Sequence, residues 1–175
     1  MLRQRAVMLL LPLAAALALP DAAPAQESSL RGTFAIDRAH SDDVNRAIET
    51  AVARMSFVTR PIARGRLRRT NPVYSRVVIA SGGSEVTTTF DQRRPITSPG
   101  NGSAVKWTRE DGEEFDLTTS WENGRLVQTF RAEDGTRTNT YSISADGRVL
   151  TMHVRLTSPR LAQPLTYNLV FNRAS

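Results

Sequence analysis

The stretch that decides the fold runs from residue 105 to residue 157, VKWTREDGEEFDLTTSWENGRLVQTFRAEDGTRTNTYSISADGRVLTMHVRLT. Four Asp-Gly or Asn-Gly pairs divide it at intervals of 12, 11 and 12 residues: Asp111-Gly112, Asn123-Gly124, Asp134-Gly135 and Asp146-Gly147. Each pair favours a type I′ turn, whose twist matches that of the two strands in a β-hairpin. The spacing therefore predicts five consecutive antiparallel strands near 103–110, 113–121, 125–133, 136–144 and 148–157.

The sequence on both sides of this stretch continues the strand pattern. The SGGS segment at 81–84 predicts a hairpin between strands near 73–80 and 85–91, and a last strand is predicted near 164–173. This gives eight strands, or nine if residues 94–98 are extended. In the strand at 148–157, alternate residues share one apolar face: Leu150, Met152, Val154 and Leu156. A long meander with one apolar face either closes into a barrel or is covered by a second layer.

An amphipathic helix is predicted ahead of the strands. Ser41 is a good N-cap, Asp42 and Asp43 suit the first turn, and apolar residues then recur at spacings of three and four up to residue 58. Pro61 ends this helix near residue 60 and starts a shorter helical piece that runs to residue 69. One helix is too small to cover the whole sheet. We therefore expect a mainly β fold, an antiparallel up-and-down meander of eight or nine strands that forms a closed or nearly closed barrel, preceded by the amphipathic helix.

The first 25 residues have the pattern of a secretory signal peptide. Arg3 and Arg5 precede an apolar run of 14 residues, whereas a helix that crosses a bilayer needs about 20. Ala23 and Ala25 suit signal peptidase, so cleavage is predicted after Ala25. An uncleaved membrane anchor is the alternative. With the signal removed, we expect a periplasmic or secreted protein without a transmembrane segment.

The predicted organisation of the mature chain is a single domain. Residues 26–72 supply a polar lead-in, the amphipathic helix and an Arg-rich segment, and residues 73–175 form the antiparallel barrel. The mature chain keeps 21 basic and 16 acidic residues, a net charge of +5. Between residues 60 and 76 there are six arginines and no acid.

The composition removes most of the usual catalytic machinery. The chain has no cysteine and only two histidines, His40 and His153, which excludes disulfides, thiol chemistry and Cys-ligated zinc. The acidic run at 110–116 is a candidate calcium site, but alternating strand positions send its side chains to opposite faces. We therefore predict no catalytic residue, no cofactor and no metal, and hence no enzyme. An acid/base site of carboxylates and tyrosines in the barrel mouth is the alternative.

From about residue 73 to the end, the predicted meander resembles the architecture of the calycins, the group of lipocalins and fatty-acid-binding proteins, and a few short motifs are loosely similar to theirs. Gly32-Thr33-Phe34 resembles the lipocalin Gly-x-Trp opening with Phe for Trp, although here it precedes the predicted helix. Thr138-Asn139-Thr140-Tyr141 is loosely similar to the family's Thr-Asp-Tyr. Leu165-Thr166-Tyr167 keeps the tyrosine of the Arg-x-Tyr carboxylate clamp of fatty-acid-binding proteins and lacks its arginine. The resemblance implies a meandering barrel around a ligand cavity.

Two functions follow as hypotheses. The first is an exported soluble barrel that binds a small apolar or amphipathic ligand, including an anionic one, because an eight-stranded barrel has room for one small ligand. Its predicted lining residues are Trp107, Arg109, Tyr141, Met152 and Tyr167, with Arg109 pairing an acidic head group. The alternative for these residues is that they only fill the core.

The second hypothesis is a cell-envelope interaction protein that docks through its Arg-rich patch. The predicted anion-binding residues are Arg64, Arg66, Arg68 and Arg69. They would meet anionic lipid, glycan or an acidic partner protein. Nucleic acid is not expected as a partner, because the signal peptide takes the chain away from it. The alternative for the Arg-rich patch is a solvated surface that binds no partner.

Overall fold

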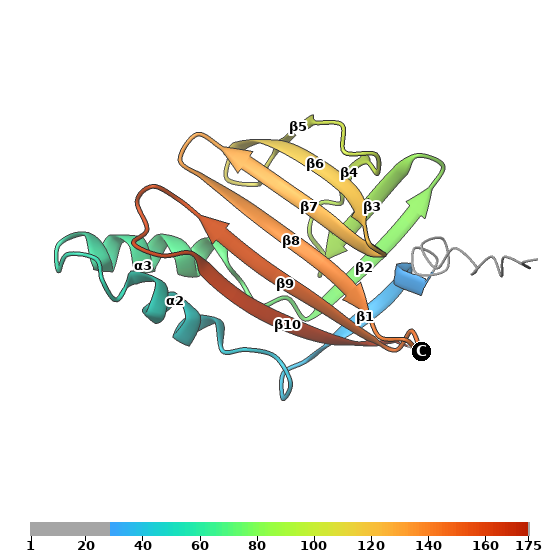
Figure 1. Ribbon diagram of the computed structural model, residues 1–175, viewed down its shortest axis with the longest axis horizontal. Helices are drawn as coiled ribbons and strands as arrows, with labels where there is room; N and C mark the ends of the chain where they lie inside the picture. The colour runs from blue at the N-terminus through green and yellow to red at the C-terminus, as the bar shows by residue number, and fades with distance from the viewer. Residues whose placement is uncertain (1–28, 175) are drawn as a thin grey trace, which may run out of the picture.

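The computed structural model describes residues 29–174, so the predicted signal peptide and its cleavage site lie outside the described residues. Within this range ten antiparallel strands combine with two helices, α2 and α3 (Figure 1). The elements are β1 (Gly32–Asp37), α2 (Val44–Val52), α3 (Thr59–Thr70), β2 (Arg76–Gly82), β3 (Glu85–Phe90), β4 (Ile96–Pro99), β5 (Val105–Thr108), β6 (Glu114–Glu122), β7 (Arg125–Ala132), β8 (Gly135–Ile143), β9 (Val149–Thr157) and β10 (Leu165–Arg173). The mainly β, up-and-down architecture is thus confirmed.

The strands form one sheet that curves into a nearly closed barrel. Their order is β4-β3-β2-β1-β10-β9-β8-β7-β6-β5, and every pairing is between antiparallel neighbours. The edge strands β4 and β5 are not neighbours in this order. Instead, β4 and the loop after it contact β6, through an isolated bridge between Asn101 and Ser120 and through the hydroxyls of Ser98 and Thr119, whose oxygens are 2.5 Å apart. The backbone N–H of Gly102 also donates to the carbonyl oxygen of Thr119, at 2.8 Å. A few contacts thus replace a full ladder where the barrel closes.

One difference from the sequence-based expectation concerns the segment before the helices. The predicted polar lead-in contains β1, which pairs with both β2 and β10. Only Phe34 of this strand is buried, so its alternation was too weak to reveal it. The Gly32-Thr33-Phe34 motif therefore lies in the first strand, and the two helices precede the other nine strands rather than all ten.

Arg173, at the end of β10, links this strand to the residues just before β1. Its guanidinium lies 4.6 Å from the ring centroid of Phe34. It also donates hydrogen bonds to the carbonyl oxygens of Gly147, Arg31 and Ser29, so the positive charge is satisfied by backbone groups. Gly32 has a φ of +145°, and a Cβ there would overlap this guanidinium. This cluster fixes β1 against β10 and explains why glycine begins the strand.

The helices lie at one end of the barrel (Figure 1). The N-cap of α2 is Asp43, whose carboxylate accepts from the backbone N–H groups of Asn45 and Arg46. Ser41, expected as the cap, instead accepts from the backbone N–H of Val170 and ties the loop to β10. Helix α2 buries four apolar side chains: Val44, Ile48, Ala51 and Val52.

The first helix ends at Val52, earlier than expected, and α3 begins at Thr59. Arg60 stabilises the connection because its guanidinium donates to the carbonyl oxygens of Ala53 and Met55, at 2.8 and 2.7 Å. In α3 only Leu67 is buried, so this helix presents a narrow apolar face to the barrel. No helix among residues 29–174 has the length and apolar character needed to cross a membrane.

Candidate functional site

A cavity of about 570 Å³ lies between α3 and the interior of the barrel. Met55, Ile62 and Leu67 line it on the helical side. On the strand side, Trp107, Phe115 and Phe130 form an aromatic wall in which each ring contacts the other two, with centroids 5.2 to 6.2 Å apart. Apolar and aromatic walls of this kind are typical of sites for small amphipathic molecules.

Arg137 is the most unusual group in this cavity. Strand alternation turns its side chain from β8 to the barrel interior, where Nε donates to Asn139 Oδ1 at 2.9 Å. One terminal nitrogen donates to Asn71 Oδ1 at 2.8 Å and to the carbonyl oxygen of Thr70 at 3.4 Å. The other donates to the hydroxyl of Tyr167 at 3.3 Å. All four acceptors are neutral, and among the ion pairs within residues 29–174 none involves Arg137.

A network of polar side chains continues from Arg137 into the barrel. The Tyr141 hydroxyl accepts from Asn139 and donates to Gln128 Oε1 at 3.0 Å. Gln128 Oε1 also accepts from the hydroxyl of Thr88, at 3.2 Å. Burial raises the pKa of Tyr141 well above its ordinary value, so its hydroxyl stays protonated. These side chains form a hydrogen-bonded layer below the cavity.

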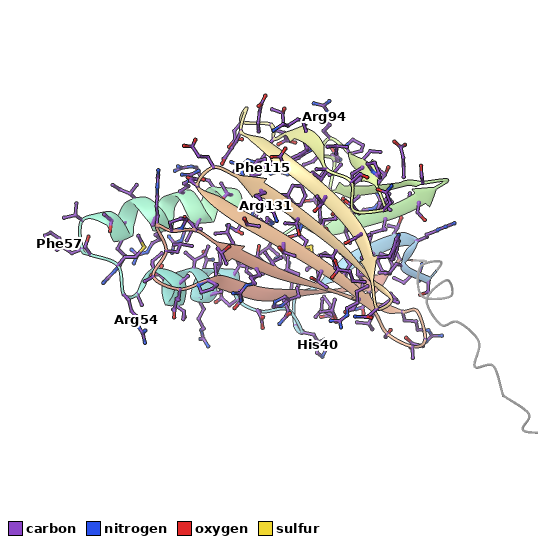
Figure 2. The ribbon with its side chains drawn as sticks, turned by 45° about the horizontal axis from the view of Figure 1, so that its top comes forward. His40, Arg54, Phe57, Arg94, Phe115 and Arg131 are labelled. Carbon is purple, nitrogen blue, oxygen red and sulfur yellow. The ribbon has the colours of Figure 1, made fainter. Side chains whose placement is uncertain are left out.

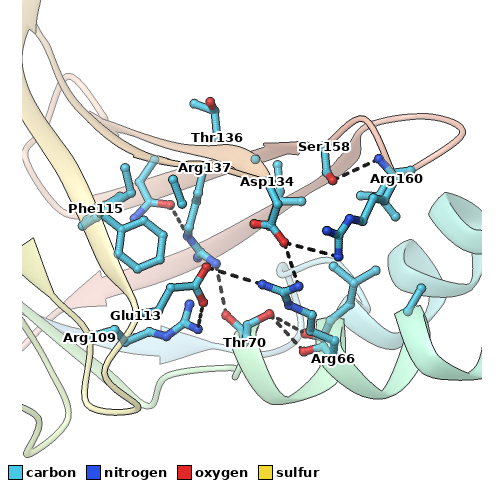
Figure 3. A pocket seen from close by; sticks show the side chains of 18 of the residues that line it. Arg66, Thr70, Arg109, Glu113, Phe115, Asp134, Thr136, Arg137, Ser158 and Arg160 are labelled. Carbon is cyan, nitrogen blue, oxygen red and sulfur yellow. Dashed lines mark hydrogen bonds and ion pairs between the residues drawn. The ribbon is translucent and has the colours of Figure 1, made fainter.

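Ion pairs close one side of the cavity mouth (Figure 3). Arg66 of α3 contacts Asp134, in the β7–β8 turn, at 2.7 Å, and Glu113, next to β6, at 3.4 Å. Arg160, in the β9–β10 loop, lies 3.9 Å from the same Asp134 oxygen. The helix is thus linked by charge to the turns at this end of the barrel. Each pair is partly exposed to solvent, so it contributes at most about 1 kcal/mol.

Arg109 was expected to meet an acidic head group, and it does line the cavity. Its guanidinium, however, contacts Asp111 at 2.7 Å and Glu113 at 2.5 Å. The hydrogen bonds from Arg109 lower the pKa of Asp111 to about 2. Arg109 therefore already has two carboxylate partners, whereas Arg137 has none among the described ion pairs.

The other predicted lining residues divide into two groups. Trp107 lines the cavity. Tyr141, Met152 and Tyr167 are buried in the core instead, although the hydroxyl of Tyr167 reaches the Arg137 network and donates to Asn71 at 3.1 Å. Strand alternation puts Arg137 in one row with Asn139 and Tyr141, but no feature of the sequence distinguishes it from the other arginines.

The predicted anion-binding arginines are only partly available. Arg64 and Arg68 both contact Glu49 of α2, at 2.7 and 3.2 Å. Arg66 belongs to the cavity mouth, and Arg69 has no ion pair among the described residues. Beside this patch, at the start of α3, Phe57 and Ile62 are 87% and 72% exposed. Figure 2 shows Phe57 at the outer tip of the helical pair, with Arg54 nearby.

The acidic run at 110–116 forms ion pairs with basic neighbours. Glu110 contacts Arg93 at 3.0 Å, and Asp116 contacts Lys106 at 2.8 Å. Of the two histidines, His40 contacts Asp37 and His153 contacts Asn168, and both lie on the surface. In the part of the chain that the structure describes, no three His, Cys, Asp or Glu side chains come close enough to hold a metal ion.

Comparison with known proteins shows similarity in structure only. No protein-family model and no curated protein matches the sequence. Echinococcus granulosus fatty-acid-binding protein 1 is 11% identical, with a TM-score of 0.55 over 85% of this chain and 99% of that one. A Schistosoma mansoni fatty acid binding protein in complex with arachidonic acid is 17% identical, with a TM-score of 0.54 over 85% and 98%.

A third match is an abundant heat soluble (SAHS) protein from Ramazzottius varieornatus. It is 8% identical, with a TM-score of 0.60 over 83% of this chain and 96% of that chain. These matches cover nearly the whole length of each compared protein. The fold is therefore a barrel like those of the fatty-acid-binding proteins, in agreement with the calycin-like architecture expected from the meander.

Proposed function

We propose that this chain binds one amphipathic anion, for which a long-chain carboxylate is the simplest example. The observation that supports it is Arg137, a guanidinium held by neutral acceptors at the wall of an apolar cavity. A charge removed from water gains most from an opposite charge that also accepts its hydrogen bonds. The carboxylate would sit at Arg137, and the hydrocarbon tail would lie along Trp107, Phe115 and Phe130.

The size and charge of the cavity support the same ligand class. Its volume of about 570 Å³ is within the range of about 300 to 1,000 Å³ found for small-molecule sites. Four arginines and two carboxylates line it, and both carboxylates already contact arginines. Two of the compared proteins are named as fatty-acid-binding proteins, and one was solved with arachidonic acid. A neutral apolar ligand would leave Arg137 without a counter-charge.

Calorimetric titration of residues 26–175 with palmitate and with hexadecanol tests the proposal. We expect one palmitate to bind per chain and hexadecanol to bind more weakly. The reason is that a hydrogen bond to a charged group contributes about 1.5–3 kcal/mol. Arg137→Met should weaken palmitate binding by about ten-fold or more and leave hexadecanol nearly unchanged. The matched control is Arg155→Met, on an exposed position of β9, with the same loss of charge. Equal palmitate affinity in Arg137→Met and the parent would refute the proposal.

We also propose that the protein acts outside the cytoplasm. The support is the signal pattern at 1–25, with two arginines, a 14-residue apolar run and small residues at 23 and 25. Expression of the full chain in a bacterial host, followed by fractionation and N-terminal sequencing, tests this. A periplasmic product beginning at Gln26 is expected. A full-length product that stays in the cytoplasm would contradict it.

A second candidate function is docking of the helical tip on an anionic bilayer, and the exposed Phe57 and Ile62, together with Arg54 in the connection before α3, favour it. Apolar side chains would enter the headgroup region while the arginines meet lipid phosphates. Sedimentation with phosphatidylglycerol vesicles should show binding that high salt weakens. Phe57→Ser with Arg54→Glu should abolish it. Equal sedimentation of this variant and the parent would reject the docking surface.

A further inference from the structure

Tyr74 lies in the connection between α3 and β2 and lines the cavity. Its ring stacks on Phe90, with centroids 4.4 Å apart and an angle of 29° between the planes. The guanidinium of Arg93 lies 5.5 Å from the centre of the same ring. An aromatic ring and a cation therefore hold the Tyr74 ring in place, although the residue belongs to no helix or strand.

The hydroxyl of Tyr74 differs from those of the other two tyrosines. Tyr141 donates to Gln128 and accepts from Asn139, and Tyr167 donates to Asn71 and accepts from Arg137. Each of these two hydroxyls thus already donates one hydrogen bond and accepts another. The Tyr74 hydroxyl has no hydrogen-bond partner among residues 29–174, yet it is not among the fully buried unpartnered atoms of that range. It is therefore an unused donor on a residue that borders the cavity.

Tyr74 and Arg137 line the same cavity, so a head group held by Arg137 lies in the space that Tyr74 also borders. Burial raises the pKa of Tyr74, and the positive charges of Arg137 and Arg93 act in the opposite direction. The hydroxyl stays protonated at neutral pH, so it can donate a hydrogen bond to an anion.

We infer that Tyr74 is a specificity-determining residue that donates its hydroxyl hydrogen to the second oxygen of a head group held by Arg137. This inference rests on the proposed function and makes it more specific. A carboxylate has two acceptor oxygens, so it can accept from Arg137 and Tyr74 at once. An alcohol has a single oxygen and cannot bridge the two donors equally well. The site would then prefer a carboxylate over an uncharged head group through geometry as well as charge.

Tyr74→Phe is the direct test, because it removes the hydroxyl and keeps the ring that packs on Phe90. We expect palmitate affinity to fall about five- to ten-fold and hexadecanol affinity to change less than two-fold. The matched control is Thr129→Val, which removes a hydroxyl from the outer face of β7, away from the cavity, and should change the palmitate-to-hexadecanol ratio less than two-fold. Thermal unfolding of both variants checks that they fold.

A spectroscopic measurement separates a contact with the ligand from a purely structural role. In NMR spectra of protein labelled with 13C at the tyrosine Cζ, the Tyr74 signal is identified as the one that is missing in Tyr74→Phe. Palmitate should shift this signal more than it shifts the signals of the other two tyrosines. If palmitate binds the parent and requires Arg137, yet Tyr74→Phe binds it equally well and the Tyr74 signal does not move, this inference is overturned and the proposed function stands. If the parent binds no palmitate, both are overturned.

Discussion

Replacement of Ile48 by aspartate tests whether α2 is part of the barrel core. Ile48 is 1% exposed and lies in the apolar face that α2 shares with Val44, Ala51 and Val52. Loss of the buried side chain costs about 1.5–3 kcal/mol, and the new carboxylate must be either buried or exposed by opening the helix. The total should exceed about 3 kcal/mol. For a domain of this size that corresponds to a fall in Tm of roughly 6–12 °C or more.

Thermal unfolding followed by far-ultraviolet circular dichroism measures this effect. Asn45→Asp is the matched control, because it adds a carboxylate to an exposed position of the same helix and should leave Tm nearly unchanged. Ile48→Ala removes the packing without adding charge, so its Tm should lie between those of Ile48→Asp and Asn45→Asp. Burial raises the pKa of the new aspartate, so its carboxyl group becomes neutral in the folded state as pH falls toward 4. The difference in Tm between Ile48→Asp and the parent should therefore become smaller at low pH. A Tm for Ile48→Asp within error of Asn45→Asp would refute the packing of α2 on the barrel.

Three further predictions concern the ends of the barrel and its buried tyrosines. Gly32→Ala should destabilise the fold by about 1–3 kcal/mol in urea unfolding, because of its φ of +145° and the overlap with Arg173; Gly82→Ala, where a Cβ meets nothing within 4 Å, should have little effect. Arg66→Met should lower the free energy of unfolding by about 1 kcal/mol or less in low salt. In 1 M NaCl the difference in this free energy between Arg66→Met and the parent should become smaller. If the difference in stability between Arg66→Met and the parent does not depend on salt, the ion pairs of Arg66 are not its cause. Finally, burial raises the pKa of Tyr74 and Tyr141 above the ordinary value of 10.0. The contribution of these two tyrosines to stability should therefore be constant below pH 10 and fall above it, because the unfolded chain ionises first. Tyr141→Phe should show a shallower fall between pH 10 and pH 11.5 in urea titrations.

The strand architecture could be predicted because its signals are local. A turn dipeptide and the alternation on either side of it determine a hairpin within about twenty residues. Even so, the hairpin at Asp134-Gly135 turns one residue earlier, since Ala132 pairs with Gly135. Glycine is required there for a different reason, because a Cβ would lie 2.7 Å from the carbonyl oxygen of Thr157. Strand β1 was missed because it buries one side chain and its partners are distant in sequence.

The site was harder to predict, because its decisive contacts join residues far apart in the chain. The partners of Arg137 include Asn71 and Tyr167, which are 66 and 30 residues away. Sequence alternation places Arg137 in the barrel interior, but it does not reveal which arginine lacks a carboxylate neighbour. For Arg109 the information was local, since Asp111 and Glu113 follow it by two and four residues. Their spacing across a hairpin turn could have indicated that its charge is already paired.

A crystal structure of residues 26–175 grown with palmitate is the most direct test of the proposed binding mode. We expect one palmitate in the cavity, with a carboxylate oxygen within hydrogen-bond distance of Arg137, about 2.7–2.9 Å for a charged pair. Its tail should contact Trp107, Phe115 and Phe130. An empty cavity at saturating palmitate, or a palmitate whose carboxylate lies at Arg66 with the tail pointing toward Arg137, would contradict the account.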